Sequence, residues 1–124
     1  MESQAGKQGA EEWNKKAIKV KFLSKELESE YDKLKAANPE LHKAITRAIE
    51  KLKLNRLAGR RIKDEQVSKR YLSLYGAQHF WKLDLNREWR LIYTLTGGGA
   101  EVRILAIILA WYTDHKQYQK EVYR

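Results

Sequence analysis

The chain has 124 residues, of which 43% are hydrophobic, and it carries 25 Lys and Arg against 16 Asp and Glu. This size and balance fit one small globular domain with a basic surface. The longest apolar run, residues 104–111, is far shorter than the roughly 20 residues that span a bilayer. Residues 1–16 lack the apolar stretch of a secretory signal, and there is no cysteine for a disulfide, a thiolate metal site or a thiol nucleophile. We expect a cytoplasmic protein with no membrane contact.

The positive charge is concentrated in the second part of the chain. Residues 56–124 contain 13 basic and 7 acidic side chains, whereas residues 1–55 contain 12 and 9. Such a surface attracts anions, so it favours a nucleic acid, an acidic partner protein or an anionic membrane surface without choosing between them.

The first half of the chain predicts a tail, a strand and two helices. Residues 1–16 have no periodicity, so we expect a disordered tail there and a single domain over residues 17–124. Residues 17–23 alternate apolar and lysine side chains, which is typical of a strand with one buried face. Ser24 and the pair Asn38-Pro39 are helix-start signals, and apolar residues at helical spacing follow each. We predict helices over residues 24–37 and from 39 to about 54, paired as an antiparallel hairpin.

The second half predicts a sheet. Residues 57–76 contain basic pairs and only short structural hints, which we interpret as a structured basic loop. Strands are expected over residues 79–85, 89–96 and 101–110, joined by a tight Asn86-Arg87 turn and a Gly97-Gly98-Gly99 hairpin. The last strand is apolar on both faces, so it belongs in the sheet interior with something covering each side. A short turn or helix ends the chain. The fold class is α+β: an N-terminal strand, a helical hairpin and a three-strand antiparallel meander.

Several kinds of site find no support in the sequence. The histidines at 42, 79 and 115 lie in three different predicted elements, and no HExxH or Cys/His spacing is present. No GxSxG elbow exists, and the glycine run at 97–99 lacks the Lys and Ser/Thr of a phosphate-binding loop. We therefore expect neither a metal nor a cofactor.

Strand parity predicts which residues share a face of the sheet. Trp81, Leu83 and Leu85 share one face of their strand, and Trp89, Leu91 and Tyr93 share one face of the next. We assign these two sets to the core beneath the helices.

The opposite parity brings two cations together. Lys82 and Arg90 fall on the other face of the same two strands, which we predict to be open. The same pattern also fits an ordinary solvated strand face, on which the cations pair with Asp84 or Glu88. Tyrosines and tryptophans mixed with Arg and Lys suit stacking on unpaired bases, but the tyrosines equally suit packing.

The serial order of several short segments resembles the RelE/ParE toxin superfamily. These segments are residues 69–71 (KRY), 75–76 (YG), 80–83 (FWKL), 89–93 (WRLIY) and 114–118 (DHKQY), and the resemblance is strongest over about residues 59–118. It implies a compact α+β domain that acts as the toxin of a toxin-antitoxin pair. Most members of that kind are metal-independent endoribonucleases that cut messenger RNA on the ribosome.

The resemblance also implies a set of catalytic residues. Arg90 is similar to the arginine that clamps the scissile phosphate, and Lys82 to a strand lysine that binds or activates the substrate. His115 resembles a histidine that some relatives use as general acid or base, and Tyr118 a C-terminal tyrosine that stacks on or orients the substrate. Imidazole, which titrates nearest to neutral pH, suits that role. The remaining basic residues, expected to hold messenger or ribosomal phosphates, are Arg60, Arg61, Lys69, Arg70 and Lys116.

Two positions depart from the family pattern. Asp84 stands where the best-known RelE enzymes carry a second strand lysine, and Tyr112 stands where they carry a catalytic arginine. The resemblance then implies that His115 takes over a role that lysine or arginine fills in those enzymes, or that the activity is weak. The ParE branch inhibits DNA gyrase with the same fold, so gyrase inhibition and a catalytically inactive RNA-binding role stay open as alternatives. For each, the expected partner is an antitoxin whose acidic segment folds onto the basic surface.

Overall fold

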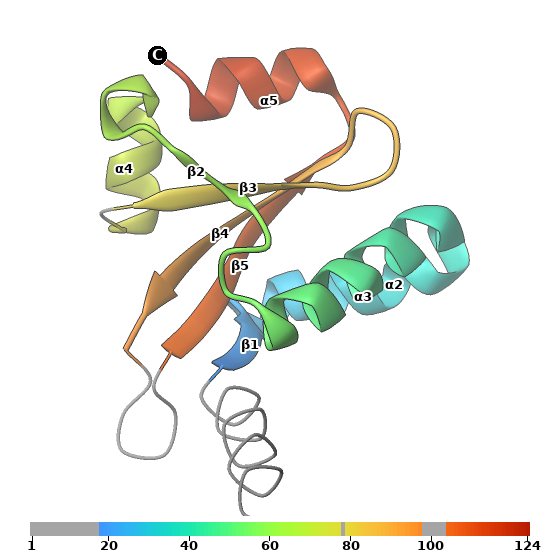
Figure 1. The fold of residues 1–124 in the computed structure, drawn as a ribbon. Helices are drawn as coiled ribbons and strands as arrows, with labels where there is room; N and C mark the ends of the chain where they lie inside the picture. The colour runs from blue at the N-terminus through green and yellow to red at the C-terminus, as the bar shows by residue number, and fades with distance from the viewer. Residues whose placement is uncertain (1–17, 78, 98–103) are drawn as a thin grey trace, which may run out of the picture.

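The described part of the chain forms a five-stranded sheet with helices on both faces (Figure 1). The structure is a computed structural model that describes residues 18–77, 79–97 and 104–124. The strand order is β1-β5-β4-β3-β2. The predicted tail over residues 1–16, and Gly98 and Gly99 of the predicted hairpin, lie outside the described residues.

The first strand and the two helices that follow it form as predicted. β1 (Ile18–Phe22) pairs in parallel with the last strand, and α2 (Lys25–Ala37) and α3 (Pro39–Leu54) connect it to the rest of the chain. The Ser24 hydroxyl accepts a hydrogen bond from the Leu27 amide at 3.1 Å, and the Asn38 carboxamide accepts one from the Leu41 amide at 3.2 Å. These caps satisfy free N–H groups at the helix starts, which is why the sequence signals marked both starts correctly.

The prediction of a basic loop over residues 57–76 is wrong. This segment contains the edge strand β2 (Arg60–Ile62), a 3₁₀ turn over Asp64–Gln66 and the helix α4 (Lys69–Tyr75). Ser68 caps α4 through its hydroxyl, and Gly76 ends the helix at φ 62°, a left-handed conformation that glycine adopts without strain. Each element is too short to show a clear periodicity in the sequence. In β2, two arginines precede the single buried residue, Ile62, so the segment does not look like a strand.

The rest of the sheet is larger than the predicted meander. β3 (Phe80–Asp84), β4 (Arg90–Thr96) and β5 (Ile104–Tyr112) are antiparallel neighbours, but β1 and β2 extend the sheet at its two edges and change the strand order. The turn between β3 and β4 is longer than the predicted pair, since the Trp89 amide bonds the Asn86 carbonyl and Arg87 has φ 57°. α5 (His115–Val122) follows β5.

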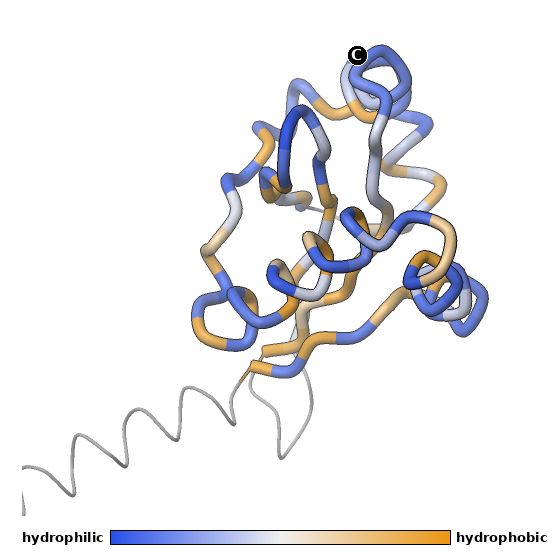
Figure 2. The backbone as a smooth tube through the Cα atoms, turned by 90° about the vertical axis from the view of Figure 1, so that its right-hand side faces the viewer, coloured by the Kyte–Doolittle hydropathy of each residue, from blue (hydrophilic) through white to orange (hydrophobic). Residues whose placement is uncertain are grey.

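The core beneath the helical hairpin agrees with strand parity. Leu83, Trp89, Leu91 and Tyr93 are buried against α3, while Trp81 and Leu85 are half-buried at its margin. Hydrophobic residues follow the strands through the centre of the molecule, and the outer helix faces are hydrophilic (Figure 2).

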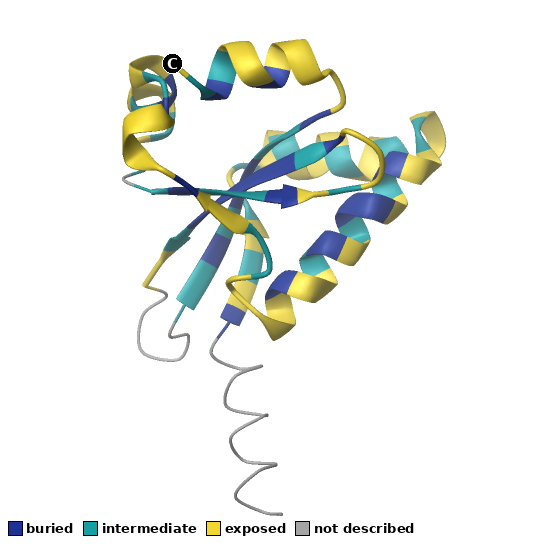
Figure 3. Ribbon diagram, turned by 45° about the horizontal axis from the view of Figure 1, so that its top comes forward, coloured by how far each residue is buried: buried dark blue, intermediate teal, exposed yellow. Residues whose placement is uncertain are grey.

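The opposite face of the sheet is not open, which corrects the prediction. α4 and α5 cover it, and their buried sides face the strands (Figure 3). A second hydrophobic cluster lies there, formed by Ile62, Val67, Tyr71, Phe80, Ile92, Leu109, Tyr112, Tyr118 and Val122. Phe80 and Ile92 are fully buried, although they share a face with Lys82 and Arg90. One face is therefore apolar at one end of the strands and polar at the other.

Candidate functional site

The two predicted strand cations lie at the polar end of the face that α4 and α5 cover. Arg90 begins β4 opposite Asp84, the last residue of β3, and Lys82 lies one pleat earlier opposite Ile92. Neither cation is fully exposed, and the Arg90 side chain keeps only 20% of its accessible surface. Strand register therefore places both groups on one face, with Arg90 at the start of β4 and Lys82 two residues from the end of β3.

Arg90 is held by a carboxylate. Its Nε lies 2.9 Å from Oδ1 of Asp84, and its Nη1 donates to the Trp89 carbonyl at 3.0 Å. Arg60 of β2 reaches the other oxygen of Asp84 at 3.2 Å. The alternative in which the strand cations pair with Asp84 is thus confirmed for Arg90. Two guanidinium groups share one carboxylate, which leaves an excess of positive charge at this position.

Lys82 contacts a residue that the sequence analysis did not assign to the site. Its Nζ donates to the Tyr123 hydroxyl at 3.0 Å and lies 5.6 Å from the centre of the Tyr123 ring. The Tyr123 hydroxyl is in turn 2.9 Å from that of Tyr118. A chain of polar groups therefore runs from β3 through the C-terminal residues to α5. No sequence signal pointed to Tyr123, because its role depends on how the end of the chain folds back.

Tyr118 is 2% exposed, so its ring offers no free face for stacking on a base. Burial raises the pKa of its hydroxyl, the hydrogen bond with Tyr123 raises it further, and the positive charge of Arg90 lowers it by less. The hydroxyl stays protonated at neutral pH. Tyr118 is consequently suited to hydrogen bonding and not to service as a general base.

His115 is the first residue of α5 and is exposed. The preceding Asp114 caps the helix, since its carboxylate accepts hydrogen bonds from the amides of Lys116 and Gln117 at 2.9 and 3.4 Å. The His115 ring lies 6.0 Å from the Tyr118 ring, centre to centre. An accessible imidazole therefore lies beside Tyr118.

The predicted phosphate-binding residues separate into groups. Arg60 pairs with Asp84, and with Arg90 these residues form what we call the Asp84 cluster. Arg70 and Lys116 border a depression of about 490 Å³ between α4 and α5, together with Gln117, Lys120 and the acidic Asp114 and Glu121. Lys69 is exposed at the start of α4.

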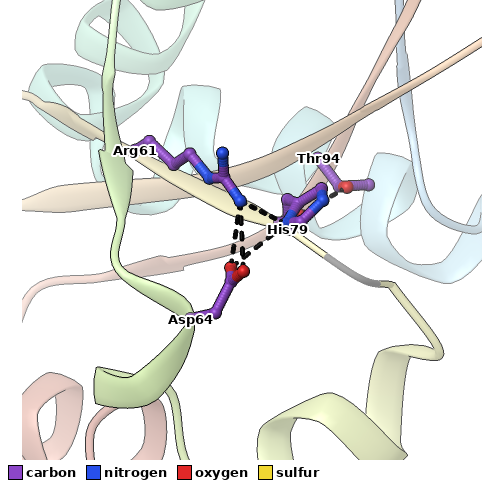
Figure 4. Close-up of polar contacts among 4 residues, drawn as sticks. All are labelled: Arg61, Asp64, His79 and Thr94. Carbon is purple, nitrogen blue, oxygen red and sulfur yellow. Dashed lines mark hydrogen bonds and ion pairs between the residues drawn. The ribbon is translucent and has the colours of Figure 1, made fainter.

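Arg61 points to the other face of the sheet. Its Nη2 contacts both carboxylate oxygens of Asp64, at 3.2 and 3.1 Å, and Nδ1 of His79 at 2.6 Å, and that same Nδ1 is 3.1 Å from Asp64 (Figure 4). The hydrogen bond with His79 and the charge of Arg61 lower the pKa of Asp64. The buried Thr94 donates to the His79 carbonyl at 2.8 Å. The structure thus does not bring Arg61 to the site of Lys82 and Arg90.

Comparisons with protein-family models, with curated proteins and with solved structures gave no match to this chain. Within the described ranges, no three acidic, histidine or cysteine residues gather as metal ligands would. The helices of these ranges are also too short or too polar for any of them to cross a membrane.

Proposed function

We propose that the protein is the toxin of a toxin-antitoxin pair and acts as a ribosome-dependent endoribonuclease that cleaves messenger RNA and blocks translation in the cytoplasm. The observation that supports this most is that Lys82, Arg90 and His115 all adjoin Tyr118: Lys82 through the Tyr123 hydroxyl, Arg90 through its charge and His115 through its ring. These residues come from β3, β4 and α5, yet they provide cations, a hydroxyl and an accessible imidazole around one position. The family resemblance of the sequence motifs supports the same function.

The chemistry needs no metal ion. In RNA cleavage the 2'-oxygen attacks the adjacent phosphorus, a cyclic 2',3'-phosphate forms, and the 5'-oxygen leaves with a proton. In the proposed reaction the scissile phosphate replaces the Asp84 carboxylate as the partner of Arg90. Lys82 stabilises the additional negative charge of the transition state. Two protons move, one off the 2'-hydroxyl and one onto the leaving 5'-oxygen. His115 accepts the first, because the protonated Tyr118 hydroxyl cannot, and the second comes from solvent or from the protonated imidazole.

The proposed partners follow from charge and position. Arg70, Lys116 and Lys120 beside the depression between α4 and α5 would hold phosphates of the message or of ribosomal RNA. An antitoxin with an acidic segment would bind the same basic surface and fold as it binds.

The test is cleavage of a defined message on programmed ribosomes in EDTA, with cut ends mapped by primer extension. We expect the wild type to cleave and His115→Ala to lose cleavage while its thermal unfolding stays that of the wild type. His79→Ala is the matched control, because it removes a partly exposed imidazole at the other end of β3. Full cleavage by His115→Ala would contradict the assigned role.

A second candidate, an RNA-binding protein without catalysis, has one observation in its favour. Arg90 is already paired with Asp84, and the Tyr118 ring is buried. This candidate predicts salt-sensitive RNA binding with no cut product from the wild type. If the wild type neither cleaves nor binds RNA, inhibition of gyrase supercoiling is the next assay.

A further inference from the structure

The C-terminal residue pair Tyr123-Arg124 folds back along the segment before α4. Val67 and Tyr123 form an antiparallel bridge, the Ser68 amide donates to the Val122 carbonyl at 2.8 Å, and the Arg124 amide donates to the Gln66 carbonyl at 3.0 Å. The Arg124 side chain adds a bond from Nε to the Val67 carbonyl at 3.2 Å. The backbone around Tyr123 is therefore fixed by contacts that do not involve its side chain.

The Tyr123 side chain is directed back to the sheet from this anchored segment. Its hydroxyl accepts from Lys82 at 3.0 Å and lies 2.9 Å from the Tyr118 hydroxyl, and its ring packs edge-on against the Tyr118 ring at 5.5 Å. Tyr123 is half-buried, so it is anchored and still borders the surface. It thus contacts two of the four residues proposed to be catalytic.

We infer that Tyr123 is a positioning residue that holds the Lys82 ammonium group in place for the reaction. The inference rests on the proposed function. A lysine side chain has four rotatable bonds and a compact charge, so its ammonium group has no fixed place unless a partner supplies one. Tyr123 supplies both an oxygen acceptor and the negative face of an aromatic ring. Because Tyr118 touches the same hydroxyl, Tyr123 also ties Lys82 to α5, the helix that His115 begins.

The variant Tyr123→Phe tests this role, since it removes the hydroxyl and keeps the ring and the backbone pairing. We expect single-turnover cleavage on programmed ribosomes to slow roughly ten- to a hundredfold, the scale of a displaced reacting group, with ribosome binding unchanged. Tyr75→Phe is the matched control, because Tyr75 is a half-buried tyrosine of the same hydrophobic cluster that contacts Tyr71 and Phe80 and not Lys82. It should cleave as the wild type does.

A double-mutant cycle separates positioning from a general structural effect. If Tyr123 acts through Lys82, the double variant Lys82→Ala/Tyr123→Phe cleaves no more slowly than Lys82→Ala alone. Additive losses, or equal losses in rate and in ribosome binding, would overturn the inference, and so would wild-type cleavage by Tyr123→Phe.

Failure of the proposed function gives a different result. A wild type that does not cleave overturns the function and the positioning role together, whereas a cleaving wild type with an equally active Tyr123→Phe overturns only the positioning role. Nuclear magnetic resonance of the lysine ammonium groups adds a readout that needs no activity. We expect the Lys82 ammonium signal to be ordered in the wild type and in Tyr75→Phe and to lose that order in Tyr123→Phe.

Discussion

Arg60 and Arg61 are neighbours on β2, and each belongs to a cluster of charged residues centred on one aspartate. The two clusters lie on opposite faces of the sheet. Arg60 meets Asp84, which also binds Arg90, whereas Arg61 meets Asp64, which also binds His79. In each case an arginine and a second basic group share one carboxylate. The clusters differ in the second basic group, which is the guanidinium of Arg90 in the first and the imidazole of His79 in the second.

The surroundings of the clusters differ as well. In the first cluster Arg90 is mostly covered, while Asp84 is half exposed and Arg60 more so. In the second, Arg61, Asp64 and His79 are all about half exposed to water, where screening makes ion pairs weak. The Asp84 cluster adjoins Lys82, Tyr118 and Tyr123, and the Asp64 cluster adjoins Thr94 and Trp81. Chemistry that depends on charge is therefore expected at the first cluster, and a local structural role at the second.

The largest expected effect is on cleavage. Arg90→Ala should lower the single-turnover rate on programmed ribosomes by about a hundredfold or more, the typical cost of removing one group that stabilises transition-state charge. Arg61→Ala, which removes the same side chain from the other cluster, should leave the rate close to that of the wild type. Equal losses in the two variants would show that the clusters do not differ in function.

A smaller effect is expected on the affinity for nucleic acid. Asp84→Asn removes the carboxylate that competes for Arg60 and Arg90, so binding of a single-stranded DNA oligonucleotide should tighten by roughly three- to tenfold with a steeper salt dependence. Fluorescence anisotropy across a salt series measures both. Asp64→Asn removes the same charge from the other face and serves as the control. If Asp64→Asn bound the oligonucleotide more tightly than Asp84→Asn, the nucleic acid would bind the face that carries Arg61, which would contradict the proposed site.

The smallest expected effect is on stability against acid. The Asp64 carboxyl has a pKa below its ordinary value of 3.8 in the folded protein, so it stabilises the fold above that value and loses this contribution as the pH falls through its folded pKa. Asp64→Asn should therefore have a lower urea midpoint than the wild type at pH 6, and the difference should shrink as the pH falls below 3.8 and through the lowered pKa of the folded state. A difference that grew on acidification would contradict the ion pair with Arg61 and His79.

Sequence patterns were sufficient for the elements that are long and amphipathic. The helix pair followed from Ser24, Asn38-Pro39 and the apolar spacing after them, and Leu83, Leu91 and Tyr93 were correctly assigned to the core. The pattern misled on the other face, because Lys82, Asp84 and Arg90 made it look solvated. Phe80 and Ile92 on that same face are buried under α4 and α5, so one face of these strands has two environments.

The candidate site was predictable only in part, for a related reason. Strand parity placed Lys82 and Arg90 together, and the motif around His115 placed α5 near them. The ion pair of Arg90 with Asp84, rather than with Glu88, depends on the register of two strands. The contact of Lys82 with Tyr123 depends on the pairing of Val67 with Tyr123 across 56 residues of chain. Such contacts arise from tertiary structure and leave no local pattern.

The place of β5 has a consequence for how the protein is made. β5 lies between β1 and β4 in the sheet, and its described residues begin at Ile104. Neither β1 nor β4 can complete its pairing until this strand is present. Contacts this distant in sequence form slowly and cannot form during synthesis until that strand has left the ribosome. At about 5–20 residues per second, synthesis of these 124 residues takes roughly 6–25 s, and for most of that time the sheet lacks the strand that joins β1 to β4. β1, which is made first, therefore joins the sheet only after residues 104–112 have been made.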